Sequence, residues 1–232
     1  MTGQTASEQI VLSFDTSGPW CGAAIYRGAA EGDDPFRGPT VIAPLHEEMN
    51  VGQAERLMVM AQEVLAEAKL TYQDLTRIGV GIGPGNFTGI RISVAAARGL
   101  ALSLNIPAIG VDAFEALAFG ADLPVLTCLG APRGEFYLQE RHADRVFDPV
   151  QVSLADMPPP HHTRCVCVGH NSADLAAHLG LSNAPAAFAP ASAIARIAAI
   201  APASRAATRP SPYYLRAPDA APSRIKAPVI LG

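Results

Sequence analysis

The sequence is poor in charged residues, in cysteine and in basic side chains. Only 16% of its 232 residues are charged, against about 25% in an ordinary globular domain. This shortage excludes a disordered, highly charged chain. The 17 basic and 21 acidic residues give a net charge of −4, which argues against a large nucleic-acid-binding surface because duplex binding normally shows a basic patch. Four cysteines are too sparse for a disulfide framework, so we expect reduced thiols.

Long apolar runs and a basic N-terminal region are also missing. A membrane helix needs about 20 consecutive apolar residues, and the nearest candidate, 94–111, is interrupted by Arg98, Asn105 and Pro107. Residues 1–8 are polar and carry no positive charge, unlike a signal peptide. We therefore expect no membrane segment and a cytoplasmic location.

The familiar catalytic motifs are absent as well. The sequence contains no Gly-x-Ser-x-Gly and no His-Glu-x-x-His, and His46 has no second histidine within two helical turns. The glycines at 83–89 are not followed by the Gly-Lys-Ser/Thr of a P-loop. The sequence therefore predicts no catalytic residue and no metal site.

What is present is an alternation of short apolar strands and amphipathic helices, which predicts an α/β fold. The expected strands are 10–14, 21–26, 41–43, 77–82, 108–111, 125–129, 136–139 and 165–168, and the expected helices are 50–69, 90–105, 112–119, 172–179 and 192–201. We place an N-terminal lobe at 1–106, with the glycine-rich turn and a partner surface. The remainder, 107–232, forms a smaller C-terminal lobe with a partly loose tail after Leu215.

The glycine-rich segment between a predicted strand and a predicted helix is the sharpest local signal. Free N–H groups at such a turn can surround an anion, and the turn after the first strand offers a carboxylate and hydroxyls for Mg²⁺ and phosphate. The alternative is purely structural, with Asn86 or Thr88 capping the helix. The candidate cofactor-binding residues are Asp15, Thr16, Ser17, Gly83, Gly85, Asn86 and Thr88. A cation in a first helical turn is disfavoured, which predicts an acidic partner or ligand for Arg91.

Histidine and cysteine gather near residue 165. The group comprises His161, His162, Cys165, Cys167 and His170. Alternation along a strand places both cysteines on one face, but Cys-x-Cys is not a usual zinc spacing. Flanking valines favour an ordinary strand with buried thiols.

Three segments resemble the TsaB (YeaZ) family. The first is Gly81-x-Gly83-Pro84-Gly85-Asn86-Phe87-Thr88-Gly89-Ile90-Arg91, preceded by Asp15-Thr16-Ser17. The others are Gly134-Glu135-Phe136-Tyr137 and, near the C-terminus, Tyr214-Leu215-Arg216. The likeness covers most of 9–140 and then thins until the tail.

The resemblance implies a two-lobed actin/sugar-kinase/Hsp70-like fold, with mixed sheets flanked by helices, among the glycoprotease-like (peptidase M22 type) proteins. It implies a non-catalytic scaffold for a TsaD-type catalytic subunit, which with the TsaE-type ATPase threonylcarbamoylates N6 of adenosine 37 in tRNA. It also implies a homodimer in isolation, tRNA contact only through partners, and no firmly bound cofactor, with ATP, ADP or Mg²⁺ at most at the complex interface.

Two departures from the family pattern stand out. Gln53 lies near the start of the helix that in the catalytic relative carries a histidine pair, and 130–133 reads Gly-Ala-Pro-Arg in place of Asp-Ala-Arg. Apolar stripes on helices 50–69 and 90–105 predict the partner interface. Its expected members are Leu57, Met58, Ala61, Leu65, Arg91, Val94, Ala97 and Ala101.

The alternatives to a scaffolding subunit are an independent ATP-binding phosphotransferase, an M22-type metallopeptidase, or an anion-binding module unrelated to tRNA.

Overall fold

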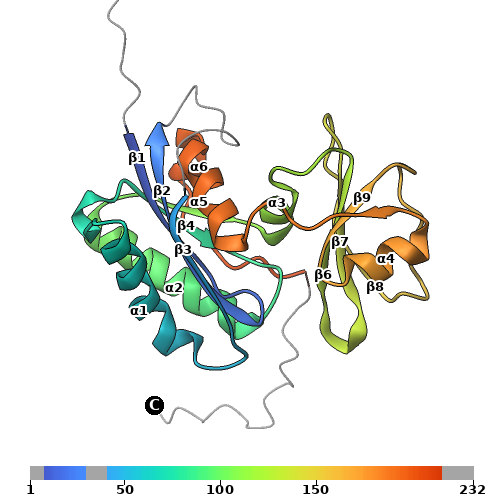
Figure 1. Ribbon diagram of the computed structural model, residues 1–232, viewed down its shortest axis with the longest axis horizontal. Coiled ribbons are helices and arrows are strands. Elements are labelled where there is room, and N and C mark those ends of the chain that lie inside the picture. Colours follow the sequence, from blue (N-terminus) through green and yellow to red (C-terminus); the bar gives the residue numbers. More distant parts are fainter. Residues whose placement is uncertain (1–7, 30–40, 216–232) are drawn as a thin grey trace, which may run out of the picture.

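The computed structural model describes residues 8–29 and 41–215, and it folds them into two lobes, each built on a five-stranded mixed sheet (Figure 1). The strands of the first sheet are β1 (Glu8–Asp15), β2 (Trp20–Ala29), β3 (Val41–Glu48), β4 (Arg77–Gly81) and β5 (Ala108–Val111). They lie in the order β3-β2-β1-β4-β5. β1, β2 and β3 pair antiparallel, whereas β4 and β5 continue the sheet in parallel.

The second sheet repeats this arrangement. Its strands are β6 (Val125–Gly130), β7 (Phe136–Arg141), β8 (Val150–Val152), β9 (Val166–Gly169) and β10 (Ser182–Asn183). Their order is β10-β9-β6-β7-β8, again with an antiparallel trio followed by two parallel strands. β6 thus holds the place of β1. The predicted two-lobed α/β fold of actin-like type, with mixed sheets and flanking helices, is confirmed.

Helices cover both faces of the first sheet (Figure 1). One face carries α1 (Gln53–Glu67) and α2 (Phe87–Leu104), and the other carries α5 (Pro190–Ile200) and α6 (Ala203–Ala206). Side chains alternate along β1, so Leu12 and Phe14 join the core under α1 and α2 while Val11 joins the core under α5. The short α3 (Ala113–Ala118) lies between the lobes, and α4 (Ser172–Leu179) packs on the second sheet. Two 3₁₀ turns, Tyr72–Asp74 and Pro132–Gly134, complete the elements.

The lobe boundary differs from the predicted division at residue 106. β5 pairs with β4 in the first sheet, and α5 returns to that sheet from far along the chain. The alanines and isoleucines of α5 fill the space over Val11, Tyr26 and Ile109, and the Ser13 hydroxyl donates a 2.7 Å hydrogen bond to the Ala191 carbonyl. The predicted loose tail, 216–232, lies outside the described residues, as does Arg216.

Most of the predicted partner interface is the core of this chain. Six of the eight residues are at most 8% exposed: Leu57, Ala61, Leu65, Val94, Ala97 and Ala101. The periodic apolar stripe of each helix faces its own sheet, which is the usual destination of such a stripe. Met58 is half-buried and Arg91 is exposed. The prediction was therefore wrong for the six buried positions.

Both helices nevertheless leave small or apolar side chains in solvent. Val59 on α1 and Leu102 on α2 are 47% and 80% exposed, and Ala95 and Gly99 on α2 are exposed too. We call these four residues the outer helix face. Among the described helices, α2 alone has the length and apolar composition of a membrane-crossing helix, with a mean hydropathy of 1.2. It packs on β4, but only 33% of its residues are buried. Part of its apolar surface is left uncovered by the described chain.

Candidate functional site: the cavity between the lobes

A cavity of about 350 Å³ opens between the two lobes. The first lobe contributes the turn after β1 and the glycine-rich turn after β4, and the second lobe contributes the end of β6 and His170, which follows β9. Its lining includes Asp15, Trp20, Asn86, Tyr137, His170 and Phe188. Two of the sequence-predicted cofactor residues, Ser17 and Gly85, also line it. The carboxyl ends of central strands are where α/β folds place ligands, so this is the candidate site.

The carboxylate of Asp15 lines the cavity and already accepts hydrogen bonds from neighbouring residues. Its Oδ2 accepts a 2.7 Å hydrogen bond from the Trp20 indole, and its Oδ1 accepts a 3.2 Å bond from the Ser17 backbone N–H. The side chain is buried, and burial raises the pKa of Asp15 above its usual 3.8 despite these hydrogen bonds. Each carboxylate oxygen of Asp15 therefore already accepts one hydrogen bond, and a Mg²⁺ ion would have to compete with these partners.

This burial gives a pH-dependent expectation for Asp15→Asn. A carboxyl with a raised folded-state pKa contributes stability that is fully present below its unfolded pKa of 3.8 and is lost as pH rises through the folded pKa. The free energy of unfolding of Asp15→Asn should therefore increase relative to wild type as pH rises from about 4 toward neutrality. Urea unfolding at a series of pH values measures this difference.

The exposed Asp74 provides the control, because hydrogen bonds from the Thr71 N–H and hydroxyl lower its pKa. A carboxyl with a lowered folded-state pKa loses its contribution only as pH falls below the unfolded value. The difference between Asp74→Asn and wild type should therefore show no rise from about pH 4 upward. A difference between Asp15→Asn and wild type that stays constant across this range would contradict a raised pKa for Asp15.

The glycine-rich turn uses its N–H groups internally. Asn86 caps α2, with Oδ1 accepting hydrogen bonds of 3.0 Å from both Thr88 N–H and Gly89 N–H. The Ile90 N–H reaches the Asn86 carbonyl at 2.9 Å, and the Asn86 N–H reaches the Ser17 carbonyl at 2.6 Å. The structural alternative is confirmed for Asn86. An anion at this helix start would have to displace the cap.

The other predicted cofactor residues lie away from the cavity. Thr16 is fully buried, and its hydroxyl donates a 2.7 Å hydrogen bond to the Gly89 carbonyl. Gly83 packs against Ile90 and the Tyr213 carbonyl, and Thr88 is exposed. The structure therefore brings Asp15, Ser17, Gly85 and Asn86 to the cavity, and it gives Thr16, Gly83 and Thr88 roles in holding the turn.

The second lobe offers little for phosphate. β6, the counterpart of β1, ends at Gly130 rather than at a carboxylate, and the His170 ring packs directly on that glycine. Among the described residues that line the cavity, Asp15 is the only carboxylate and there is no lysine or arginine. Phosphoryl transfer depends on cations and metal ligands around the transferred group, and this cavity is poor in both.

Arg91 has an aromatic partner rather than the predicted acidic one. Its guanidinium lies 3.8 Å from the centre of the Phe87 ring, and its Nε donates a 3.1 Å hydrogen bond to the Tyr214 hydroxyl. The Phe87 and Tyr214 rings are also in contact, with centroids 4.9 Å apart. The glycine-rich motif and the Tyr-Leu segment that carried the family resemblance therefore meet in space, although more than a hundred residues separate them.

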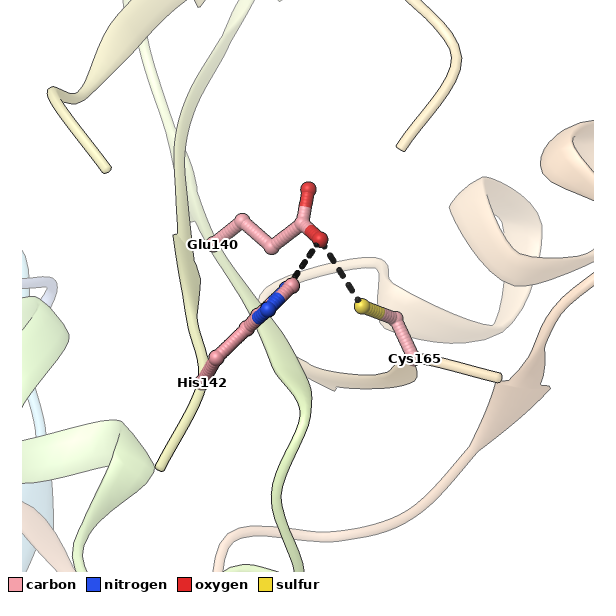
Figure 2. Close-up of side chains that lie close together, drawn as sticks. All are labelled: Glu140, His142 and Cys165. Atoms are coloured by element: carbon pink, nitrogen blue, oxygen red, sulfur yellow. Dashed lines mark hydrogen bonds and ion pairs between the residues drawn. The ribbon is translucent and has the colours of Figure 1, made fainter. Parts of the chain in front are cut away.

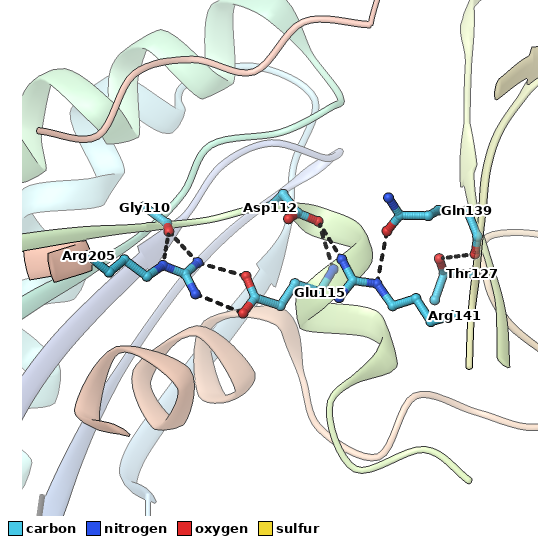
Figure 3. Close-up of polar contacts among 7 residues, drawn as sticks. All are labelled: Gly110, Asp112, Glu115, Thr127, Gln139, Arg141 and Arg205. Atoms are coloured by element: carbon cyan, nitrogen blue, oxygen red, sulfur yellow. Dashed lines mark hydrogen bonds and ion pairs between the residues drawn. The ribbon is translucent and has the colours of Figure 1, made fainter. Parts of the chain in front are cut away.

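A polar network fixes the lobes around the cavity (Figure 3). Arg141 from β7 reaches Asp112 at 3.5 Å, and Asp112 caps α3 through a 2.8 Å bond from the Glu115 N–H. On the other side, Arg205 from α6 pairs with both Glu115 oxygens and with the Gly110 carbonyl. α3 is thereby tied to each lobe.

Four lining residues were not among the predicted site residues, although Tyr137 belongs to a family-like segment and His170 to the histidine and cysteine group. Trp20, Tyr137, His170 and Phe188 come from four different segments. A usable signal existed for one of them, since Trp20 is the only tryptophan in the chain and sits immediately after the Asp-Thr-Ser turn. The others are brought together by tertiary folding alone.

Comparison with known proteins agrees with this architecture. Residues 47–162, half of the chain, match the family model described as TsaD, tRNA N6-adenosine threonylcarbamoyltransferase. The chain is 34% identical over 136 residues to the "tRNA threonylcarbamoyladenosine biosynthesis protein TsaB" of Buchnera aphidicola, covering 56% of this chain and 60% of that protein. It is also 34% identical over 154 residues to an uncharacterized protein of Mycobacterium tuberculosis, covering 64% of this chain and 67% of that protein. The chain belongs to the TsaB (YeaZ) family.

A solved structure supports the fold of this TsaB-family chain. It is a Pseudomonas aeruginosa protein described as similar to peptidase YeaZ, with a TM-score of 0.69 at 22% identity, covering 90% of this chain and 100% of that one. The chain spans about half the length of the curated TsaB relatives it matches.

Proposed function

We propose that this TsaB-family chain is a non-catalytic subunit that supports a TsaD-type catalytic subunit. With a TsaE-type ATPase, the assembly would form N6-threonylcarbamoyladenosine at position 37 of tRNA in the cytoplasm. In this proposal the chain meets tRNA only through its partners, and any ATP, ADP or Mg²⁺ binds where subunits join. Family membership carries the proposal, because relatives bear names in this biosynthesis.

The chemistry of the cavity favours a non-catalytic role for this chain over an independent enzymatic activity. Asp15 is buried and bonded to Trp20, and the described lining offers no lysine or arginine to a phosphate. The presence of Asp15 at the end of β1 is the one observation in favour of a phosphotransferase. A metallopeptidase of M22 type would need a histidine pair on α1, and α1 contains no histidine.

The outer helix face supports a protein partner. α1 and α2 lie side by side on the first sheet (Figure 1), and α2 presents Ala95, Gly99 and the 80% exposed Leu102 along one side. Small residues permit the close approach of another helix, and uncovered apolar surface typically marks an interaction site. In this proposal the outer helix face meets the TsaD-type subunit, or a second copy of the chain when that subunit is absent.

Charge on the outer helix face should abolish docking without unfolding the chain. Ala95 is exposed, so glutamate there costs little stability, whereas an unpaired charge at the centre of an interface costs roughly tenfold or more in affinity. We expect Ala95→Glu to lose co-purification with the tagged TsaD-type subunit of the same cell. Circular dichroism of the purified variant confirms that it is folded.

Ala173→Glu is the matched control, since Ala173 is an exposed helical alanine in the second lobe. It should co-purify at the wild-type level. Wild-type capture by Ala95→Glu would show that the partner binds elsewhere. Failure of the wild-type chain itself to capture the TsaD-type subunit, together with ATP turnover that Asp15→Asn abolishes, would favour the phosphotransferase.

A further inference from the structure

A carboxylate, an imidazole and a thiol lie close together where β7 ends and β9 begins (Figure 2), whereas the cavity is lined by the opposite ends of β6 and β7. Glu140 is in β7, His142 follows that strand, and Cys165 immediately precedes β9. The potential ligand atoms of these three residues all lie within 4.8 Å of one another. Glu140 Oε1 is 2.6 Å from His142 Nε2 and 3.4 Å from Cys165 Sγ.

The carboxylate at the centre of the cluster is buried. The Glu140 side chain is 5% exposed, and Cys165 is fully buried. Its two oxygens face His142, His161 and Cys165. Its ion-pair partners among the described residues are these two histidines, with no lysine or arginine. A buried negative charge with no permanent cation beside it is an expensive arrangement.

We propose that Glu140, His142 and Cys165 bind a zinc ion. Carboxylate oxygen, imidazole nitrogen and thiolate sulfur are the three donor types that Zn²⁺ takes, at 2.0–2.3 Å. Ionised Glu140 and a Cys165 thiolate together carry the two negative charges that balance the ion. Tetrahedral ligands lie roughly 3.5 Å apart. The 3.4 Å separation of Glu140 Oε1 from Cys165 Sγ already fits, whereas the 2.6 Å separation of Oε1 from His142 Nε2 has to widen by about 1 Å. Binding breaks the Cys165 S–H bond and the N–H bond at His142 Nε2, which donates to Glu140 in the metal-free chain. The thiol proton leaves to solvent, and His142 binds as a neutral imidazole with its proton on Nδ1.

His161 contacts the second carboxylate oxygen of Glu140. Its backbone N–H and its Nδ1 lie 2.8 Å and 2.9 Å from the other oxygen of Glu140, Oε2. Its ring stacks on Phe147 with centroids 3.9 Å apart, although the side chain is 61% exposed. Such a partner fixes the orientation of a ligating carboxylate and tunes affinity. A water molecule takes the fourth position on the ion.

The histidine and cysteine group seen in the sequence contains Cys165 but neither Glu140 nor His142. The structure instead combines Cys165 with Glu140 and His142 from a different strand. Residues 142–165, a proline-containing connection with only one short strand, would be tied to the sheet by the ion at both ends.

Metal titration of the purified, reduced full chain tests the site. After chelator treatment and dialysis, wild-type protein should bind one Zn²⁺ per chain by elemental analysis. Co²⁺ should give the visible bands of a tetrahedral ion and a thiolate-to-cobalt charge-transfer band. Cys165→Ala should lose the charge-transfer band, and His142→Gln should lose stoichiometric binding. His161→Ala should weaken zinc binding by about 10- to 100-fold.

Matched controls separate ligand loss from damage to the fold. Cys167→Ala removes a neighbouring buried thiol, and His178→Gln removes an exposed histidine on α4. Both should retain one Zn²⁺ and the cobalt spectrum. A wild-type chain that remains metal-free, or a Cys167→Ala variant that loses the charge-transfer band while Cys165→Ala keeps it, would overturn the proposal. His142 follows the last residue of β7, so His142→Gln should fold. This variant therefore tests the site even if Cys165→Ala is unstable.

Discussion

Replacing Gly89 with alanine should destabilise the chain by at least about 3 kcal/mol, at the upper end of what overpacking costs. A Cβ atom on Gly89 would lie 1.8 Å from the Thr16 carbonyl oxygen. That obstacle is backbone, so no side-chain rotation relieves it. Thr16 is itself buried, and its hydroxyl donates to the Gly89 carbonyl. The substitution therefore forces apart β1 and the start of α2, and urea unfolding measures the loss.

The same helix supplies the control. A Cβ on Gly99 would meet no atom within 4 Å, so Gly99→Ala should change stability only through helix propensity, a gain of about 0.5–1 kcal/mol. Opposite signs for the two glycines are the expected result. A free energy of unfolding for Gly89→Ala within about 1 kcal/mol of the wild-type value would contradict the close approach of the turn after β1 to α2.

The second large effect is expected for Ala97→Glu. Ala97 is fully buried on the side of α2 that faces the first sheet. Glutamate there must bury a charge in an apolar core and also exceed the available volume, each of which costs several kcal/mol. We expect the variant to be largely unfolded or insoluble, as judged by circular dichroism and by the fraction recovered in the soluble extract.

Ala95→Glu, two residues away on the exposed side of α2, should remain folded and fail only in docking. The pair separates a core residue from an interface residue with the same chemical change. A folded Ala97→Glu that still lacks its partner would mean that α2 is rotated relative to the arrangement described here. Ala97 would then belong to the interface after all.

Local pattern was enough to find the long elements but not to say what they face. The helix at 172–179 was predicted with its observed bounds, and α2 was predicted at 90–105 against an observed Phe87–Leu104. Asn86 explains the difference, because its side chain caps the helix one turn earlier. Periodicity identified one apolar stripe on each of α1 and α2. It could not distinguish a stripe covered by the chain's own sheet from one covered by another protein.

The parts that escaped prediction depend on contacts between distant segments. β8 and β10 are three and two residues long, too short for any pattern, and exist because neighbouring strands offer hydrogen-bonding edges. The return of α5 to the first sheet and the meeting of Glu140 with Cys165 leave no trace in local sequence. The lobe boundary was misplaced for the same reason, since α5 follows the whole second lobe in the chain.

The position of α5 also bears on the order in which the protein is made. The first sheet is complete at Val111, and α1 and α2 then already cover one of its faces. The opposite face, with Val11, Tyr26 and Ile109, is buried mainly by α5, which begins at Pro190. During synthesis, at about 5–20 residues per second, the ribosome must add roughly 80 more residues before that face is covered. For several seconds each nascent chain therefore presents a bare apolar sheet surface, which makes the N-terminal lobe a natural client for chaperones until the second lobe has been translated.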